Sequence, residues 1–395
     1  MSPRARFSTR ALLAALCCCL CCGMAACSAQ DAVNIARVAS GDTSAAIGMA
    51  RSKAIRYASN PSAIEADYKR FKSLLGTFRK AVSGNWGKGD AREAQPKQYV
   101  KYTQNYLSRA SVDFEAGQIT VETLDQDAPM KSLREAIVTT LLTPYDPRAV
   151  DMYSSGPVQL GATPFLLGEV TDRRGQNIRT EAQAEAFARQ LLEQGPQERP
   201  AAVAGKTVRY VVISMVGNHM QVRAVKFKPL VEAAANRFGL TRTLLYAIIR
   251  VESDFNPYAI NTVPAVGLMQ VVPQTAGADV QEFLTKRRSE PSKAFLFEPD
   301  NNITYGAAYL HLLYTRHLPA VANPVSREYC VIASYNGGSG ALLKTFDANR
   351  ARALAVINSQ PPTAVYDTIT RKHRAEETRR YLEKVLAAKK EFTGL

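Results

Sequence analysis

The chain has 395 residues, enough for two or three domains, and its 46% hydrophobic and 22% charged residues are ordinary for globular protein. A formal net charge of +15 favours anionic partners, such as nucleic acid, anionic lipid or an acidic cell-wall polymer. The densest basic cluster is only Lys286-Arg287-Arg288, which is typical of a solvated surface, so we do not expect a nucleic-acid partner.

The N-terminus has the pattern of a secretory signal. Basic residues between Arg4 and Arg10 precede an uncharged, mostly apolar run over 11–26, which is short for a membrane-spanning helix. Met24-Ala25-Ala26-Cys27 resembles a bacterial lipobox, which implies a lipid-anchored protein that begins at Cys27. Ser28 after the cysteine suggests sorting to the outer membrane, facing the periplasm. The alternative is an ordinary signal cleaved nearby, with Cys27 incidental.

Cysteine usage agrees with a lipid anchor. Five of the seven cysteines lie in the apolar run and leave with it, so only Cys27 and Cys330 remain. If Cys27 carries lipid, no intramolecular disulfide can form. Cys330 lies in the apolar run 329–332 and is expected to be a small core residue.

Residues 27–60 are small and polar and are predicted to form a tether. Apolar residues then recur at spacings of three and four, which predicts a helix over 62–82. Trp86 follows between glycine-containing breaks; it could stack on a sugar, but a core or lid position is favoured.

The segments up to residue 226 mix both kinds of secondary structure. Alternating residues on either side of 115–118 predict a β-hairpin, and 133–142 is predicted to be helical. Thr180 and Gln183 have the spacing of a capping box at the start of another helix. The run 208–216 is apolar on both faces, which favours a central strand.

The chain becomes helical from Pro229 onward, and one of these helices ends in a candidate acid. Thr241 is a plausible N-cap, and an apolar run follows it up to Glu252. Ile248 and Ile249 precede Glu252 by four and three positions, so they share its helix face and draw it toward the core.

Burial at this position would suit acid catalysis. Because burial disfavours the charged form, it raises the pKa of a carboxyl group toward the range that a general acid needs. Asn256-Pro257 is expected to stop the helix, leaving Glu252 beside a loop that substrate can reach. The alternative is a solvated surface glutamate, which is the commoner case for an arbitrary Glu.

Four motifs occur in order around and after this glutamate. They are Glu252-Ser253-x-Phe255-Asn256-Pro257, Gly267-Leu268-Met269-Gln270, Ala333-Ser334-Tyr335-Asn336-Gly337-Gly338, and Tyr381 within Arg379-Arg380-Tyr381-Leu382. Together they resemble the catalytic domain of the lytic murein transglycosylases, lysozyme-like enzymes that cut peptidoglycan. The resemblance covers about 227–390.

This resemblance implies a role for each matching residue. Glu252 would be the single catalytic acid and base, and Tyr381 would orient the reacting sugar. The residues implied in substrate binding are Ser253, Asn261, Met269, Gln270, Tyr335, Asn336 and Tyr381. Many relatives carry a serine where this chain has Asn261-Thr262, and Asn261 can still donate and accept hydrogen bonds.

Other chemistries lack support in the sequence. The four histidines are scattered and no Cys/His pair has metal-ligand spacing, so neither a metal nor another cofactor is expected. A lysozyme-type hydrolase would need a second carboxylate, and none is evident in the motifs; Asp254, if helical, would point away from Glu252. A non-catalytic, peptidoglycan-binding lipoprotein is the other alternative.

The chain carries, in order, Lys101-Tyr102-Thr103-Gln104-Asn105-Tyr106, the predicted hairpin and Pro164-Phe165-Leu166-Leu167-Gly168. This order, over about 97–226, is similar to the N-terminal domain of the membrane-bound lytic murein transglycosylase C family. We therefore predict an α+β protein in which a mixed N-terminal domain precedes a mainly α-helical, lysozyme-like catalytic domain. The expected boundaries are a signal peptide at 1–26, a lipidated tether at 27–60, the N-terminal domain at 61–226 and the catalytic domain at 227–395.

Overall fold

The computed structural model describes residues 62–260 and 265–395, with side chains from Ser73 onward. The chain divides into two compact units after Ala66, and the sheet and the helical part that follows it both lie within the second unit, 67–395. The predicted signal peptide, the tether and Cys27 lie outside the described residues, as does Asn261.

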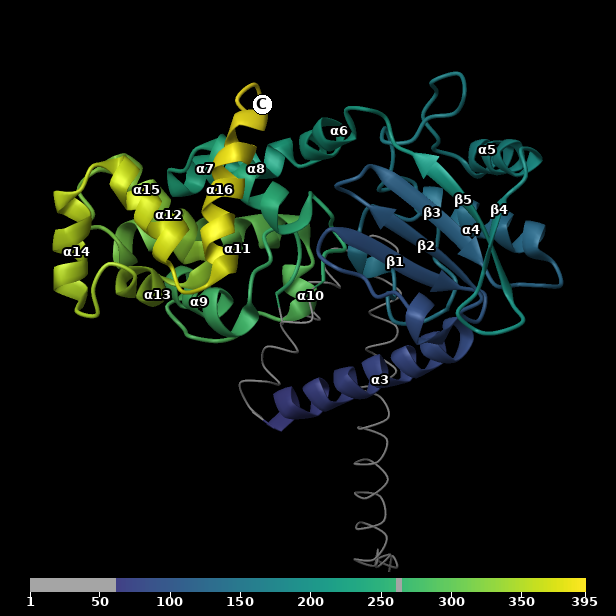
Figure 1. Cartoon of the computed structure of the whole chain (residues 1–395), viewed down its shortest axis with the longest axis horizontal. Coiled ribbons are helices and arrows are strands. Elements are labelled where there is room, and N and C mark those ends of the chain that lie inside the picture. Colours follow the sequence, from purple (N-terminus) through teal and green to yellow (C-terminus); the bar gives the residue numbers. More distant parts are fainter. Residues whose placement is uncertain (1–61, 261–264) are drawn as a thin grey trace, which may run out of the picture. The chain divides into compact units, whose positions relative to one another are not determined.

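A five-stranded antiparallel sheet organises the first part of the described chain, with strand order β1-β2-β3-β5-β4 (Figure 1). The strands are β1 Gln98–Thr103, β2 Ser108–Asp113, β3 Gln118–Thr123, β4 Gln197–Pro200 and β5 Thr207–Ser214. β2 and β3 form the predicted hairpin, and β5 is an interior strand as expected. β4 was missed by the sequence analysis; it is short, ends in Pro200 and lies at an edge, where a proline is tolerated.

Helices cover both faces of this sheet because alternate side chains of a strand point to opposite sides. On β1, Tyr99 joins the core formed with α4 (Pro129–Leu141) and α5 (Glu181–Glu193), whereas Val100 joins the core formed with α3 (Ser62–Asp90). The capping box predicted at the start of α5 is present with both of its hydrogen bonds. The long loop between α4 and α5 contains one 3-10 turn, Pro147–Ala149.

Helix α3 is longer than predicted. It continues past residue 82 to Asp90, with one non-helical residue at Gly87, where φ is 74°. Trp86 is completely buried against the sheet, and its indole nitrogen donates a hydrogen bond to the carbonyl oxygen of Tyr106 at 2.7 Å. Trp86 is therefore a core residue, which excludes sugar stacking.

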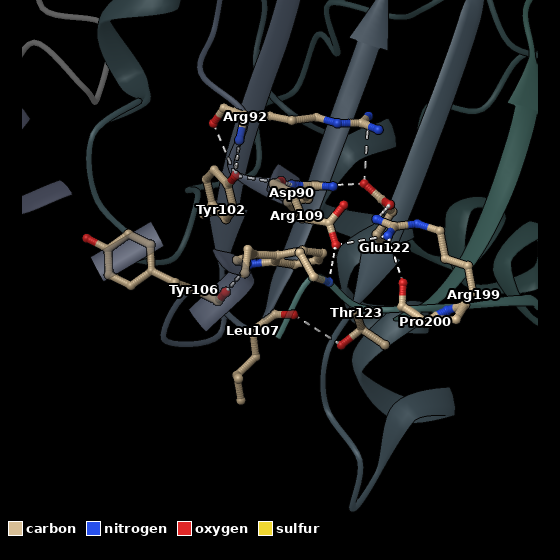
Figure 2. A network of polar contacts seen from close by, with 12 residues as sticks. Asp90, Arg92, Tyr102, Tyr106, Leu107, Arg109, Glu122, Thr123, Arg199 and Pro200 are labelled. Carbon is tan, nitrogen blue, oxygen red and sulfur yellow. Dashed lines mark hydrogen bonds and ion pairs between the residues drawn. The ribbon is translucent and has the colours of Figure 1, made fainter. Parts of the chain in front are cut away.

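Figure 2 shows an ionic network that includes Asp90, Arg109, Glu122 and Arg199. The Arg109 guanidinium stacks 4.0 Å from the Trp86 ring centroid and donates to Glu122 at 2.6 Å. Arg199 also donates to Glu122, at 2.9 Å, and to Asp90 at the end of α3. Burial alone would raise the pKa of Glu122, but the two arginines outweigh it and hold that pKa below its usual value. The network therefore ties α3, β3 and β4 together through charged groups.

The second part of the chain is built from helices around one apolar core. Its helices are α6 His219–Lys226, α7 Lys228–Phe238, α8 Arg242–Ser253, α9 Ala278–Thr285, α10 Lys293–Leu296, α11 Pro299–Leu312, α12 Pro324–Gly337, α13 Ser339–Lys344, α14 Arg350–Ser359, α15 Pro362–Lys372 and α16 Glu376–Glu391, with π-helical turns at Pro273–Gly277 and Leu313–His317. α16 runs beside α8 (Figure 1) and also contacts α12. The observed architecture confirms the predicted α+β class with a helical second part.

The loop after α8 packs against the sheet-containing part. The Asn256 side-chain amide donates to the carbonyl oxygen of Pro96 at 2.9 Å, and the Tyr258 hydroxyl donates to the carbonyl oxygen of Pro144. The Tyr258 ring also packs edge-on against Tyr99, with centroids 5.1 Å apart. These contacts bring the start of β1 close to the end of α8.

Candidate active site

Glu252 lies near the end of α8, as predicted from the apolar spacing. Thr241 caps this helix by accepting a hydrogen bond from the Leu244 amide, and Leu245, Ile248 and Ile249 are fully buried. Glu252 itself is partly exposed and lines a cavity of about 870 Å³. Burial raises its pKa to about 7, although a hydrogen bond from Tyr381 favours the charged form.

The helix ends earlier than Asn256-Pro257 would require. Asp254 adopts the left-handed conformation, with φ 53°, and Phe255 follows with φ 60°, so α8 stops at Ser253. The Asp254 carboxylate is completely buried and pairs with Arg250 and Lys97. It does not line the cavity, so it is not a partner of Glu252, although the reason is the left-handed turn and not a continuing helix.

Two tyrosines from distant helices flank the glutamate. The Tyr381 hydroxyl, on α16, donates to Glu252 Oε1 at 2.6 Å. Tyr335, on α12, lines the same cavity and donates to the Met269 carbonyl oxygen at 2.8 Å. Burial holds the pKa of each tyrosine well above its usual value, so both remain neutral donors.

The Gly267–Gln270 turn depends on close packing against Asn302. Gly267 has φ 74°, and a Cβ there would lie 2.4 Å from the Asn302 amide nitrogen, so a side chain cannot be accommodated. Asn302 is buried and accepts a hydrogen bond from the Met269 amide at 2.7 Å. Gln270 follows with φ 47° and lines the cavity. Asn302 therefore fixes the turn that places Gln270.

Gly337 lies at the contact between α12 and α16. A Cβ on Gly337 would lie 2.7 Å from the Thr378 hydroxyl. The lack of a side chain at Gly337 therefore allows α16 to pack closely against the end of α12. The same Thr378 hydroxyl donates to Asn336 at 2.7 Å, and Asn336 donates to Glu377 at 3.3 Å. These bonds hold Asn336 at the cavity wall.

The structure brings five of the predicted site residues to one cavity: Glu252, Gln270, Tyr335, Asn336 and Tyr381. Two others do not reach it. Ser253 is fully buried, and its hydroxyl donates to the carbonyl oxygens of Ile249 and Leu268. The Met269 side chain is buried against Gly306. Both residues shape the site from behind.

The sequence analysis missed much of the cavity wall. Its other lining residues are Gln95, Pro96, Lys97, Gln98, Asp113, Glu115, Val251, Ala265, Val272, Glu376, Glu377, Arg380 and Lys384. Glu377 lies four positions before Tyr381 and Lys384 three after it, so helical periodicity could have placed both on this face. No local pattern in the sequence placed Lys97 or the β2–β3 turn at the cavity.

Glu377 is a second carboxylate that the motif analysis did not find. Its charge raises the pKa of Glu252 further, whereas Lys97 acts in the opposite sense. Within residues 62–260 and 265–395, no group of three or more His, Cys, Asp or Glu side chains is arranged to hold a metal ion. The arrangement offers one carboxyl group with a raised pKa, which accepts a hydrogen bond from a neutral tyrosine and lies in a cavity lined by charged groups of both signs.

Comparisons with known proteins match both described parts of the chain. The family described as the membrane-bound lytic murein transglycosylase C N-terminal domain matches residues 64–226, and the transglycosylase SLT domain matches 229–358. Membrane-bound lytic murein transglycosylase C proteins of Yersinia pestis (strain Pestoides F) and Yersinia pseudotuberculosis serotype O:1b (strain IP 31758) are each 42% identical over 327 residues, covering 82% of this chain and 90% of theirs.

Among solved structures, the 70-kDa soluble lytic transglycosylase of Escherichia coli aligns with 26% identity and a TM-score of 0.33. That alignment covers 42% of this chain and 24% of the Escherichia coli chain. The matches to the curated sequences extend over both described parts of the molecule and most of each relative's length. This chain therefore belongs to the membrane-bound lytic murein transglycosylase C family.

Proposed function

We propose that this lytic transglycosylase cleaves the β-1,4 bond between N-acetylmuramic acid and N-acetylglucosamine with Glu252 as its only acid and base. The observation that carries the proposal is a carboxyl group with a pKa of about 7 in a cavity, hydrogen-bonded by the neutral Tyr381. Such a group holds its proton near neutral pH and can release it to a substrate.

In the first step, Glu252 gives its proton to the glycosidic oxygen, and the bond from C1 of the muramic acid to that oxygen breaks. The Glu252 carboxylate then takes the proton from the 6-hydroxyl of the same sugar, whose oxygen forms a bond to C1. The products are a 1,6-anhydro end and a free 4-hydroxyl. No water is consumed, and Glu252 regains its starting proton.

Gln270, Tyr335 and Asn336 are proposed to bind the sugars because all three line the cavity and carry hydrogen-bonding groups. Tyr381 is proposed to orient the acid. Ser253 and Met269 would contribute indirectly, by fixing the turn behind the cavity. Asn261 stays a proposed substrate contact outside the described residues.

Hydrolysis is the alternative reaction, because the carboxylate of Glu377 also lines the cavity. Retaining and inverting hydrolases need such a group as nucleophile or as base for water. However, Glu377 is exposed and accepts a hydrogen bond from Asn336. The two reactions give different products, so product analysis separates them.

The test is digestion of purified peptidoglycan in oxygen-18 water, followed by mass spectrometry. We expect new muramic acid ends to be unlabelled and lighter by one water than reducing ends. Glu252→Gln should lower turnover by about 10²–10⁴-fold while the protein still binds peptidoglycan, whereas Glu376→Gln, in the same cavity, should retain turnover. Label at C1 in most of the initial product would reject the transglycosylase reaction, and turnover by folded Glu252→Gln would reject the acid.

We further propose that the protein is anchored to the outer membrane through lipid on Cys27, facing the periplasm. The relatives are named membrane-bound, and Met24-Ala25-Ala26-Cys27 resembles a lipobox. The predicted boundaries at residues 26, 60 and 226 are part of this proposal. They place a tether between the lipid and the two domains.

Cys27→Ala should remove the lipid and release the protein from membrane fractions, because stable anchoring requires two or more acyl chains. Mass spectrometry of the mature N-terminus and fractionation would measure this. Cys330→Ala is the matched control, since Cys330 is buried in the core and should not affect lipidation. Acyl chains on the Cys27→Ala protein would disprove the anchor.

A further inference from the structure

The segment before β1 is bonded directly to the loop that follows Glu252. Asn256 donates to the Pro96 carbonyl oxygen at 2.9 Å, and the adjacent Lys97 ammonium lies 3.2 Å from Asp254 Oδ1. Asp254 is completely buried and two residues from the acid, whereas the Lys97 side chain remains 29% exposed, at the cavity wall. A cation from the sheet-containing part is thus held in the active-site cavity.

The opposite charge comes from α16. Glu377 lies one helical turn before Tyr381, which donates to Glu252, so both project from the same face of the helix. The Asn336 amide donates to Glu377 at 3.3 Å and is itself fixed by Thr378. Glu377 is therefore an oriented anion at the cavity wall, not merely a surface carboxylate.

We infer that Lys97 and Glu377 are positioning residues of opposite sign that together control the protonation of Glu252 and set the pH range in which the enzyme works. This inference rests on the proposed role of Glu252 as acid. It also gives the N-terminal part of the chain a chemical function, because that part supplies Lys97.

The charges of Lys97 and Glu377 act on the protonation of Glu252 in opposite senses. A cation nearby favours the ionised carboxylate, and an anion nearby favours the protonated form. Lys97 therefore lowers the pKa of Glu252, whereas Glu377 raises it beyond the effect of burial. Since Glu252 must be protonated to donate a proton to the glycosidic oxygen, turnover is lost as the pH rises through this pKa.

Other charged groups face the same cavity or lie on α8. Those of the cavity are Asp113, Glu115, Glu376, Arg380 and Lys384, while Arg250 and Asp254 belong to α8 and its end. Glu376 pairs with Arg380, so these two largely cancel, whereas the Asp254 carboxylate is shared by Arg250 and Lys97. Glu115 lies 4.0 Å from Lys97 and its side chain is largely exposed. Tyr335 and Tyr381 are neutral because burial keeps their pKa values high. Of the charged groups in the described part of the cavity, Lys97 and Glu377 act on Glu252 most directly.

The experiment measures kcat/KM against pH for the full-length protein on soluble peptidoglycan fragments. The alkaline limb of this profile is the pH range in which kcat/KM falls as the pH rises. In Lys97→Met this limb should move up by about half a pH unit, and in Glu377→Gln it should move down by a similar amount. Lys97→Arg should restore the wild-type limb, and the double variant Lys97→Met/Glu377→Gln should lie near the wild type. A purely structural role would lower kcat without moving the limb.

Two matched controls come from the same cavity. Lys384→Met and Glu376→Gln remove one charge each and should leave the limb in place; equal shifts in the controls would overturn the inference. Carbon-13 NMR of the Glu252 carboxyl, assigned with Glu252→Gln, should give the same two shifts without substrate. Glu377 is exposed, so its variant tests the inference even if Lys97→Met does not fold.

The outcomes separate this inference from the proposed function. If Glu252→Gln stays active, the role of the acid is wrong. If Glu252→Gln is inactive but neither Glu377→Gln nor Lys97→Met moves the limb or the NMR titration, only the control by these two charges is wrong.

Discussion

Glu122 in the sheet is buried and Glu252 at the end of α8 is partly buried, yet their pKa values are shifted in opposite directions. Glu122 accepts hydrogen bonds from Arg109 at 2.6 Å and Arg199 at 2.9 Å, and its pKa lies below the usual value. Glu252 accepts one from the neutral Tyr381, and its pKa is about 7. Burial acts to raise the pKa of both carboxyl groups, so the hydrogen-bond and ionic partners decide in which direction each pKa is finally shifted.

This difference separates a structural carboxylate from a chemical one. The permanent charges around Glu122 fix it as an anion that joins α3, β3 and β4 (Figure 2). The neutral partner of Glu252 leaves its proton exchangeable near neutral pH, which is the property expected of a catalytic acid.

The largest expected effect is on stability, from Glu122→Gln. Removing this charge leaves the fully buried Arg109 without its counter-ion, which should lower the free energy of unfolding by about 3–5 kcal/mol. Denaturant unfolding would measure the loss. Glu198→Gln is the matched control, because Glu198 pairs with Arg209 at an exposed edge and should cost about 1 kcal/mol or less. Equal losses in the two variants would show that burial of the charge is unimportant.

A somewhat smaller effect should appear in the pH dependence of stability. The folded-state pKa of Glu252 is raised from 4.5 to about 7, so its stabilising contribution is complete below pH 4.5 and is lost as the pH rises through 7. Glu252→Gln cannot ionise, so its free energy of unfolding should exceed that of the wild type by up to about 3 kcal/mol above this window.

The Glu122 carboxylate should show the reverse sign. Its pKa is lowered, so its contribution is present above the unfolded value of about 4.5 and is lost as the pH falls from that value through the lower pKa of the folded state. Urea unfolding from about pH 2 to 8 would compare both variants with the wild type. Parallel stability curves for wild type and Glu252→Gln would contradict a raised pKa.

The smallest effects should distinguish Tyr381, which bonds to Glu252, from Tyr102, which bonds to Arg92 and Arg109 in the ionic network. Tyr381→Phe removes the hydrogen bond to Glu252 and should lower kcat/KM by roughly 10-fold with little change in melting temperature. Tyr102, whose hydroxyl accepts a hydrogen bond from the Arg92 amide in the ionic network, should behave oppositely. Tyr102→Phe should lose about 1 kcal/mol of stability and keep its turnover. A loss of stability without a loss of turnover in both variants would contradict the expected difference between Tyr381 and Tyr102.

Local patterns in the sequence predicted much of the framework. The three- and four-residue apolar spacing put Glu252 on the buried face of α8, and Thr241 caps that helix as expected. The β2–β3 hairpin and the Thr180 capping box also follow from residues a few positions apart. These features are predictable because helix periodicity, strand alternation and caps depend on nearby residues.

Packing between distant segments decided the rest of the site. Tyr381 lies 129 positions from the carboxyl group it contacts, and Lys97 comes from the segment preceding β1. Ser253 and Met269 belong to the recognised motifs, yet the tertiary structure buries both behind the cavity. The sequence by itself determined that Glu252 would be drawn toward the core. Only the tertiary structure decided which charges and hydrogen-bond donors meet it there, because those contacts depend on how whole helices and the sheet pack.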